Sequence, residues 1–205
     1  MNPKKFLQKL LENHLIVAGI DEAGRGPLAG PVFAASVAIG VEDIPLLFSL
    51  KLKDSKVLSS ENREKYFEVI TRSFSCGIGI CDALEIDRLN ILQATLLAMK
   101  KSLTALARQP GVIIIDGNQA IPGVTCQQHP VVDGDALIPL VSAASIVAKV
   151  SRDRLLKKLA NKYPLYGFEK NKGYGTKFHL ESLRLNGPCP IHRRSFRPVR
   201  DFVCR

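Results

Sequence analysis

The residues best suited to chemistry are two adjacent carboxylates, Asp21 and Glu22, at the end of an apolar run, 15–20. A glycine-rich loop and a second apolar run, 32–39, follow, so the pattern predicts a strand, a loop and another strand. Two carboxylates at the end of a buried strand are costly unless a positive charge compensates them. Divalent metal ions prefer oxygen ligands, so one interpretation is a metal site. The other is a pair of acids in a solvated turn.

A third carboxylate, Asp116, directly follows the four consecutive β-branched residues 112–115. Such a run is typical of a buried central strand. A turn formed by Asp-Gly is the alternative, but two buried strands that each end in an acid favour a shared site. Asp135, just before a small-residue helix, is the candidate for a fourth acid. Asp133 is a near rival, and Asp153 a poorer one because it falls in mid-helix among basic residues.

Three further stretches have the residue types that contact phosphates or bases. Gly24-Arg25-Gly26 combines glycines, which let a ligand approach the backbone, with an arginine suited to phosphate. The loop 50–56 offers three lysines and a serine, although a plain basic loop before a helix is an equal interpretation. Tyr174 stands between two glycines beside lysines, so it could stack on a base or sugar, or pack under its own loop.

The charge distribution favours a polyanionic partner. The net charge is +10, and residues 149–205 contain 15 Lys/Arg against 4 Asp/Glu, whereas residues 1–148 contain 14 against 15. A folded surface with this excess suits nucleic acid, and a solvated face that aids solubility is the alternative.

Other chemistries have little support in the sequence. No Ser-His-Asp or Cys-His arrangement stands out, and Gly24-Arg25-Gly26 lacks the downstream Gly-Lys-Ser/Thr of a Walker-type phosphate loop. The five scattered cysteines read as reduced thiols, without zinc spacing. At 205 residues and 46% apolar, the chain is expected to form one domain, or one domain with an appendage, that buries a real core, and no apolar run approaches a membrane span.

The elements that must position these residues follow from periodicity. Helices are expected at 3–13, from Ser59 or Ser60 to about Arg72, at 86–107, over the stretch that contains 142–159, and at 179–185. Leucines and a methionine at three- and four-residue steps in 86–107 predict a core-facing stripe, namely Leu89, Leu92, Leu96, Met99 and Leu103. Strands are expected at 75–81 and 112–115, with a short extended region at 123–132.

Together, the acids at strand ends and the polyanion-binding features suggest two-metal phosphodiester hydrolysis. Two Mg²⁺ or Mn²⁺ ions about 3.5–4 Å apart would hold the attacking water and the leaving oxygen in line. Another nuclease or recombinase with a similar acid cluster is one alternative. A non-catalytic nucleic-acid-binding module, in which the acids are structural turns, is a second.

The chain also resembles the ribonuclease HII family, the type 2 ribonucleases H. The resemblance rests on Asp21 to Pro27 with Ala29 to Val32, and on six further blocks in the family's order: 52–56, 86–95, 115–118, 142–150, 173–177 and 192–196. It implies an α/β ribonuclease H-like fold: a mixed five-stranded sheet flanked by helices, with a C-terminal helical appendage. It also implies hydrolysis of the RNA strand of RNA–DNA hybrids, and cleavage 5′ of single ribonucleotides in duplex DNA, with Mg²⁺ or Mn²⁺, leaving 3′-hydroxyl and 5′-phosphate ends.

The resemblance assigns roles residue by residue. Metal-binding catalytic acids would be Asp21, Glu22, Asp116 and, as the fourth, Asp135. Gly24, Arg25 and Gly26 would read the ribose 2′-hydroxyl, and Tyr174 would pack at the RNA–DNA junction. Further nucleic-acid contacts are expected from Lys53, Ser55, Lys56, Lys149 and Lys172.

The resemblance also sets the organisation of the chain. Residues 1–160 are expected to form the catalytic domain, and 161–205 a basic substrate-contacting region packed on it. The related ribonuclease HIII type would have an additional N-terminal substrate-binding domain, and only about 20 residues precede Asp21. We expect a cytoplasmic monomer that acts in DNA replication and repair, with no membrane association.

Overall fold

A computed structural model describes residues 2–52 and 58–203 of the chain. Its centre is a five-stranded sheet in the order β3-β2-β1-β4-β5, with β1 antiparallel to β2, β2 antiparallel to β3, and β4 parallel to both β1 and β5. The strands are β1 (Val17–Ala23), β2 (Val32–Ile39), β3 (Ser75–Cys81), β4 (Val112–Asp116) and β5 (Gln127–Val131). The expected mixed five-stranded sheet is therefore confirmed.

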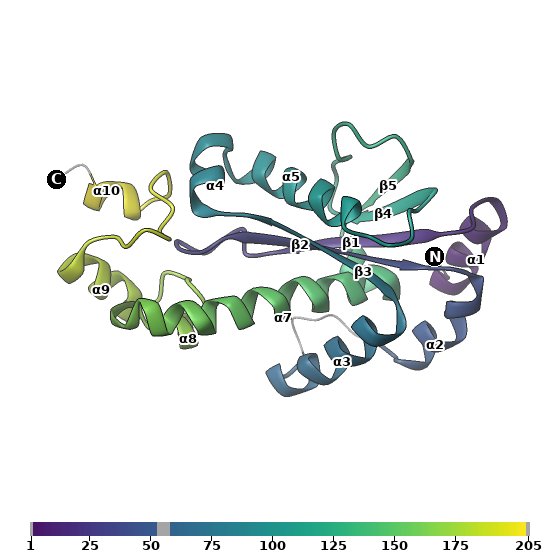
Figure 1. Ribbon diagram of the computed structural model, residues 1–205, viewed down its shortest axis with the longest axis horizontal. Coiled ribbons are helices and arrows are strands. Elements are labelled where there is room, and N and C mark those ends of the chain that lie inside the picture. The colour runs from purple at the N-terminus through teal and green to yellow at the C-terminus, as the bar shows by residue number, and fades with distance from the viewer. Residues whose placement is uncertain (1, 53–57, 204–205) are drawn as a thin grey trace.

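Helices cover both faces of this sheet (Figure 1). The long helix α7 lies along one face, with α1, α2 and α3 also contributing to the core there. Helices α4 and α5 cover the opposite face. The bounds are α1 (Pro3–Asn13), α2 (Ile44–Ser49), α3 (Ser60–Ser73), α4 (Ala83–Leu89), α5 (Ile91–Thr104), α6 (Gly134–Leu137) and α7 (Pro139–Lys162).

Short helices after α7 gather at one end of the molecule (Figure 1). They are α8 (Phe168–Asn171), α9 (Lys177–Asn186) and α10 (Val199–Val203), and 3-10 turns lie at η1 (Val41–Asp43) and η2 (Pro164–Tyr166). A separate apolar cluster at this end includes Leu28, Leu156, Phe168 and Leu183, so the β1–β2 loop, α7 and the C-terminal region are packed together.

The contact between α7 and the sheet is unusually close at one point. A Cβ atom at Gly19, in the middle of β1, would lie 2.6 Å from the backbone carbonyl atoms of Leu140. Only glycine fits there, and the run of small residues in α7 after it is buried. This close packing fixes the acid-bearing end of β1 against α7.

One sequence expectation about the helices was wrong. The predicted helix 86–107 is two helices, because Asn90 has φ of +68° and its side chain caps α5 by accepting from the N–H groups of Leu92 and Gln93. The break turns Leu89 outward, 39% exposed, whereas Leu96, Met99 and Leu103 are buried as predicted. The apolar spacing continues across the break, so periodicity alone could not reveal it.

Candidate active site

The four predicted acids border one cavity. Asp21 and Glu22 lie near the end of β1, Asp116 is the last residue of β4, and Asp135 lies in the short helix α6. Because β1 and β4 are parallel and Ile20 pairs with Ile115, the two strands deliver their acids to the same edge of the sheet. The cavity has a volume of about 280 Å³, and its lining consists of Asp21, Glu22, Ala23, Gly24, Arg25, Gly26, Asp116, Asp135, Ser145, Lys149 and Tyr174.

Two of the acids are buried and held by local hydrogen bonds. Asp21 is 4% exposed and Asp135 is 2% exposed. One oxygen of Asp21 accepts from the backbone N–H of Glu22 at 2.6 Å, and Ser145 on α7 also hydrogen-bonds the Asp21 side chain. The backbone N–H of Asp135 donates to an oxygen of Asp116 at 3.4 Å, which ties α6 to the end of β4.

The electrostatics of this cluster favour an added cation. Burial raises the pKa of Asp21 well above its usual value, and the nearby charges of Glu22 and Asp116 raise it further, against the lowering effect of Ser145. Burial also raises the pKa of Glu22, although the neighbouring guanidinium of Arg25 opposes that shift. Acids that are costly to ionise together are stabilised when a positive ion shares their site.

The donor chemistry matches a hard divalent metal. Four carboxylates supply only oxygen ligands, which Mg²⁺ and Mn²⁺ prefer over sulfur or nitrogen. Within residues 2–52 and 58–203, however, no group of three or more His, Cys, Asp or Glu side chains converges closely enough to hold a metal ion. The acids therefore border the cavity without converging on one point.

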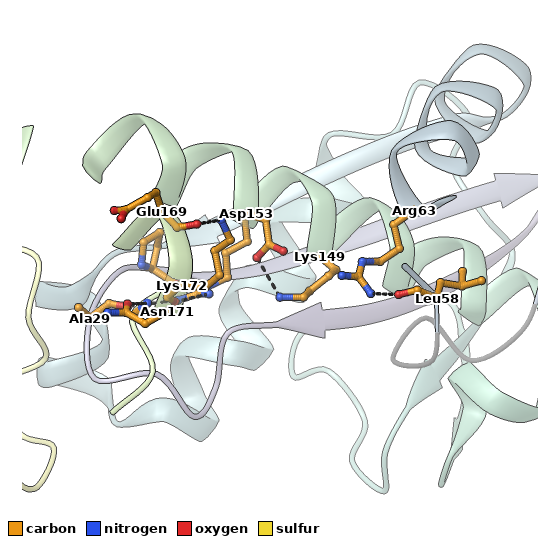
Figure 2. A network of polar contacts seen from close by, with 11 residues as sticks. Ala29, Leu58, Arg63, Lys149, Asp153, Glu169, Asn171 and Lys172 are labelled. Carbon is orange, nitrogen blue, oxygen red and sulfur yellow. Dashed lines mark hydrogen bonds and ion pairs between the residues drawn. The ribbon is translucent and has the colours of Figure 1, made fainter. Parts of the chain in front are cut away.

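The fourth-acid rivals lie in different surroundings. Asp133 precedes α6 in a left-handed conformation, is exposed, and does not line the cavity. Asp153 forms an ion pair with Lys149 at 2.8 Å on α7 (Figure 2). Asp135 is the one of the three that borders the cavity, and it lies in α6, just before α7.

The loop between β1 and β2 forms one wall of the cavity. Arg25 is half exposed and its guanidinium contacts Glu22 at 3.3 Å. Gly24 has φ of +95°, a conformation that side chains rarely adopt. Tyr174 forms the adjacent wall: it is 46% exposed, and a Cβ at Gly26 would lie 3.5 Å from its ring. The structure thus places the Gly-Arg-Gly loop and Tyr174 side by side.

The predicted lysines are placed differently from one another. Lys149 lines the cavity. The ammonium of Lys172 instead donates to the backbone oxygen of Glu169 (Figure 2). Lys172 also lines a neighbouring hollow between α3 and α7. Lys53, Ser55 and Lys56 lie outside the described residues.

The structure adds residues near the site that sequence reasoning did not single out. Ser145 falls within the block 142–150 and received no role of its own, yet it hydrogen-bonds Asp21. Arg152 and Arg193 were counted with the basic surface, yet they are 1% and 0% exposed and lie against the β1–β2 loop. No sequence signal separates them from exposed neighbours, because basic residues surround both.

Comparison with known proteins gives a uniform result. The family model described as "Ribonuclease HII" matches residues 18–199. Ribonuclease HII of Burkholderia thailandensis is 49% identical over 187 residues, covering 91% of this chain and 85% of that protein. The crystal structure of ribonuclease H2 from Pyrococcus horikoshii has a TM-score of 0.78 at 29% identity, covering 91% and 96% of the two chains.

A more distant similarity concerns the fold alone. The structure of Bst-RNase HIII in complex with Mn²⁺ has a TM-score of 0.71 at 19% identity, covering 93% of this chain and 70% of that one. Among the helices of the described residues, none is both long and apolar enough to cross a membrane.

Proposed function

The chain belongs to the ribonuclease HII family and is a ribonuclease H enzyme, and we propose that it is an endoribonuclease with two related substrates. It hydrolyses the RNA strand of RNA–DNA hybrids, and it cuts on the 5′ side of a single ribonucleotide embedded in duplex DNA. The products have 3′-hydroxyl and 5′-phosphate ends.

One observation supports this proposal above the others. The cavity bordered by four carboxylates is also bordered by Gly24-Arg25-Gly26 and Tyr174, so chemistry and sugar recognition share one space. Glycine backbone can approach a ribose closely enough to hydrogen-bond its 2′-hydroxyl, the group that distinguishes RNA from DNA. A half-exposed tyrosine beside it can stack on the neighbouring nucleotide.

Asp21, Glu22, Asp116 and Asp135 are the residues that would hold Mg²⁺ or Mn²⁺ ions. Bound there, two such ions would supply a more acidic attacking water and would offset the charge that develops on the phosphate. Bst-RNase HIII has been solved in complex with Mn²⁺, which supports a divalent ion on this fold. The protein's own part is to hold the acids: Ser145 and the Glu22 N–H fix Asp21, and the Asp135 N–H fixes Asp116.

Positive side chains around the cavity complete the proposal. Lys149 is placed to meet a phosphate near the acids, and Lys172 one farther along the duplex. Lys53, Ser55 and Lys56 are proposed as further phosphate contacts. We also propose that 1–160 form the catalytic domain and 161–205 a substrate-contacting region, in a cytoplasmic monomer that acts in replication and repair.

The direct test is cleavage of a labelled DNA duplex that contains one ribonucleotide, in Mg²⁺, Mn²⁺ or EDTA, beside the same duplex made of DNA only. The proposal expects a metal-dependent cut 5′ of the ribonucleotide and an intact control. Cleavage of the control at the same rate, or a cut on the other side of the ribonucleotide, would contradict it.

A further inference from the structure

Two buried arginines, Arg152 and Arg193, hold the loop that is proposed to recognise the ribose. The loop 24–31 leaves β1 and returns to β2 without a partner strand along most of its length. Apart from the exposed Arg25 and Gly26, its residues are nevertheless buried, and a buried carbonyl without a partner is costly.

Arg193 is 0% exposed, whereas its neighbour Arg194 is exposed to solvent. Each of the three guanidinium nitrogens of Arg193 donates to a different backbone oxygen of the loop. Nε donates to Gly30 at 2.9 Å, Nη1 to Arg25 at 2.8 Å, and Nη2 to Gly24. This one side chain therefore fixes both ends of the loop, including two residues of the Gly-Arg-Gly sequence.

Arg152, on α7, also donates to a different backbone oxygen from each of its three guanidinium nitrogens. Its Nε donates to the backbone oxygen of Pro31 at 3.0 Å and its Nη2 to that of Ala29 at 3.1 Å. Its Nη1 donates to the backbone oxygen of Lys172 at 3.0 Å, two residues before Tyr174. Arg152 thus connects the loop 24–31 to the turn that contains Tyr174.

Both arginines act as cations without a carboxylate partner. In the described part of the chain neither forms an ion pair with an acid. Burial lowers the pKa of Arg152 to about 10 and that of Arg193 to about 9, so both stay charged at neutral pH. The carbonyl oxygens accept their hydrogen bonds, and the charges of Asp153 near Arg152 and of Asp87 near Arg193 add to the compensation. Donation to three separate oxygens uses the planar fork of a guanidinium.

The loop is also shaped to receive the arginine. A Cβ at Gly24 would overlap the Arg152 side chain, so the glycine lies flat against it. A direct backbone hydrogen bond from Leu28 N–H to Gly173 O, 2.8 Å, runs parallel to the Arg152 bridge. The loop, the Tyr174 turn and α7 therefore form one connected unit.

We propose that Arg152 and Arg193 are positioning residues that set the separation and orientation of the Gly-Arg-Gly backbone and Tyr174, and thereby the enzyme's selectivity for a ribonucleotide. They do not touch the substrate. This inference rests on the proposed function, because it concerns the shape of that same site.

The test uses Arg152→Lys and Arg193→Lys, with Arg154→Lys as the matched control. Lysine keeps the charge and the aliphatic stem, but one ammonium cannot reach three carbonyl oxygens arranged in a fork. Arg154 lies on the same helix, about half exposed, and pairs with Glu64 on α3. The measurements are kcat and KM on the single-ribonucleotide duplex, and the inhibition constant of the all-DNA duplex as a competitor, well below each protein's Tm.

The expected result is a loss of at least about tenfold in kcat for both buried variants, because small displacements of positioning groups are that costly. The inhibition constant of the all-DNA duplex should stay within about twofold of the wild-type value, because phosphate contacts elsewhere do not depend on the loop 24–31. Arg154→Lys should match the wild type in both measurements.

Each other outcome has a distinct meaning. Unchanged kcat in a folded Arg152→Lys or Arg193→Lys protein would overturn the inference, as would equal losses of kcat and of all-DNA binding, which indicate general weakening. If neither variant folds at 25 °C, the arginines are structural and the inference is withdrawn. A wild-type protein that makes no metal-dependent cut would refute the proposed function itself, before any variant is compared.

Discussion

Replacement of His192 by glutamine should change how the stability of the protein depends on pH. His179 and His192 are buried in contact, with their Nε2 atoms 2.9 Å apart. Nδ1 of His179 lies 2.8 Å from the backbone oxygen of Tyr174, and a carbonyl can only accept, so this nitrogen carries the proton. Nε2 of His179 then accepts from His192, whose Nδ1 accepts from the backbone N–H of Cys189 at 2.9 Å.

This series of hydrogen bonds requires both imidazole rings to be neutral. Burial lowers the pKa of His192 from the ordinary value of 6.5 to about 4, and the charge of His179 lowers it further. The backbone oxygen of Cys189, 3.2 Å from Nδ1, partly opposes them because it can accept from that nitrogen only when the nitrogen is protonated. Burial likewise lowers the pKa of His179. The rings of Tyr166 and Phe168, which pack against the pair, supply no compensating charge.

The sign of the pH effect follows from these directions. Since His192 has a lower pKa in the folded than in the unfolded protein, the unfolded state binds more protons below about pH 6.5. The stability contributed by neutral His192 is therefore fully present above about pH 6.5 and is lost as the pH falls toward 4. At about 1.4 kcal/mol for each pH unit, the loss from His192 is roughly 2 kcal/mol at pH 5.

Glutamine cannot titrate, but its amide can still donate to His179. At pH 7.5 we expect His192→Gln to be less stable by about 1–2 kcal/mol, because the Cys189 N–H loses its acceptor. At pH 5 the difference should shrink to near zero, or reverse, because only the wild type is destabilised by protonation of residue 192.

The assay is urea unfolding followed by circular dichroism at pH 7.5, 6.5, 5.5 and 5.0, with His14→Gln as the control. His14 is only partly buried and contacts Gln127, at the start of β5 and away from this pair. A stability difference between His192→Gln and the wild type that stays constant over this pH range would refute the reasoning.

Three further predictions concern the proposed activity and the fold. Asp116→Asn should abolish cleavage in millimolar Mg²⁺ while duplex binding persists, measured by product gels and fluorescence anisotropy; near-normal turnover would remove Asp116 from the metal site. Tyr174→Ala should reduce cleavage at a single ribonucleotide more than binding to plain duplex, and equal losses would argue against a junction role. Gly19→Ala should lower the free energy of unfolding by about 1–3 kcal/mol, seen in urea titration, because its Cβ would press on Leu140; a stabilised variant would mean that α7 can move away from β1.

The positions of the acids could be predicted because strand and chemistry signals coincide in the sequence. Four β-branched residues before Asp116 indicate a central strand, and the structure ends β4 at that residue. The sequence favoured a shared site for the two acid-ended strands, and the structure provides it because β1 and β4 are parallel neighbours whose carboxyl ends lie at the same edge of the sheet. The metal-binding role of these residues stays a prediction.

The helix break at Asn90 could not be predicted from hydrophobic periodicity, although the helix-capping residues nearby indicate it. Asp82 and Glu85 form a capping box at the start of α4, and the Asn90 side chain caps α5. Apolar positions at Leu89 and Leu92 keep a helical step across the junction, so a pattern based on hydrophobicity reads one continuous helix. Asparagine tolerates positive φ, which lets the chain turn there.

The basic C-terminal region shows why a count of charges could not define a surface. Arg152 and Arg154 are two residues apart on α7, so they point to different sides of the helix: one is buried among carbonyl oxygens and the other pairs with Glu64 at the surface. Lys149 and Arg184 are likewise paired, with Asp153 and Glu181. Part of the positive excess in 149–205 thus compensates backbone dipoles and acids within the protein. The charge that faces a duplex must therefore be assigned residue by residue, and the salt dependence of binding should follow exposed lysines rather than the net charge of the region.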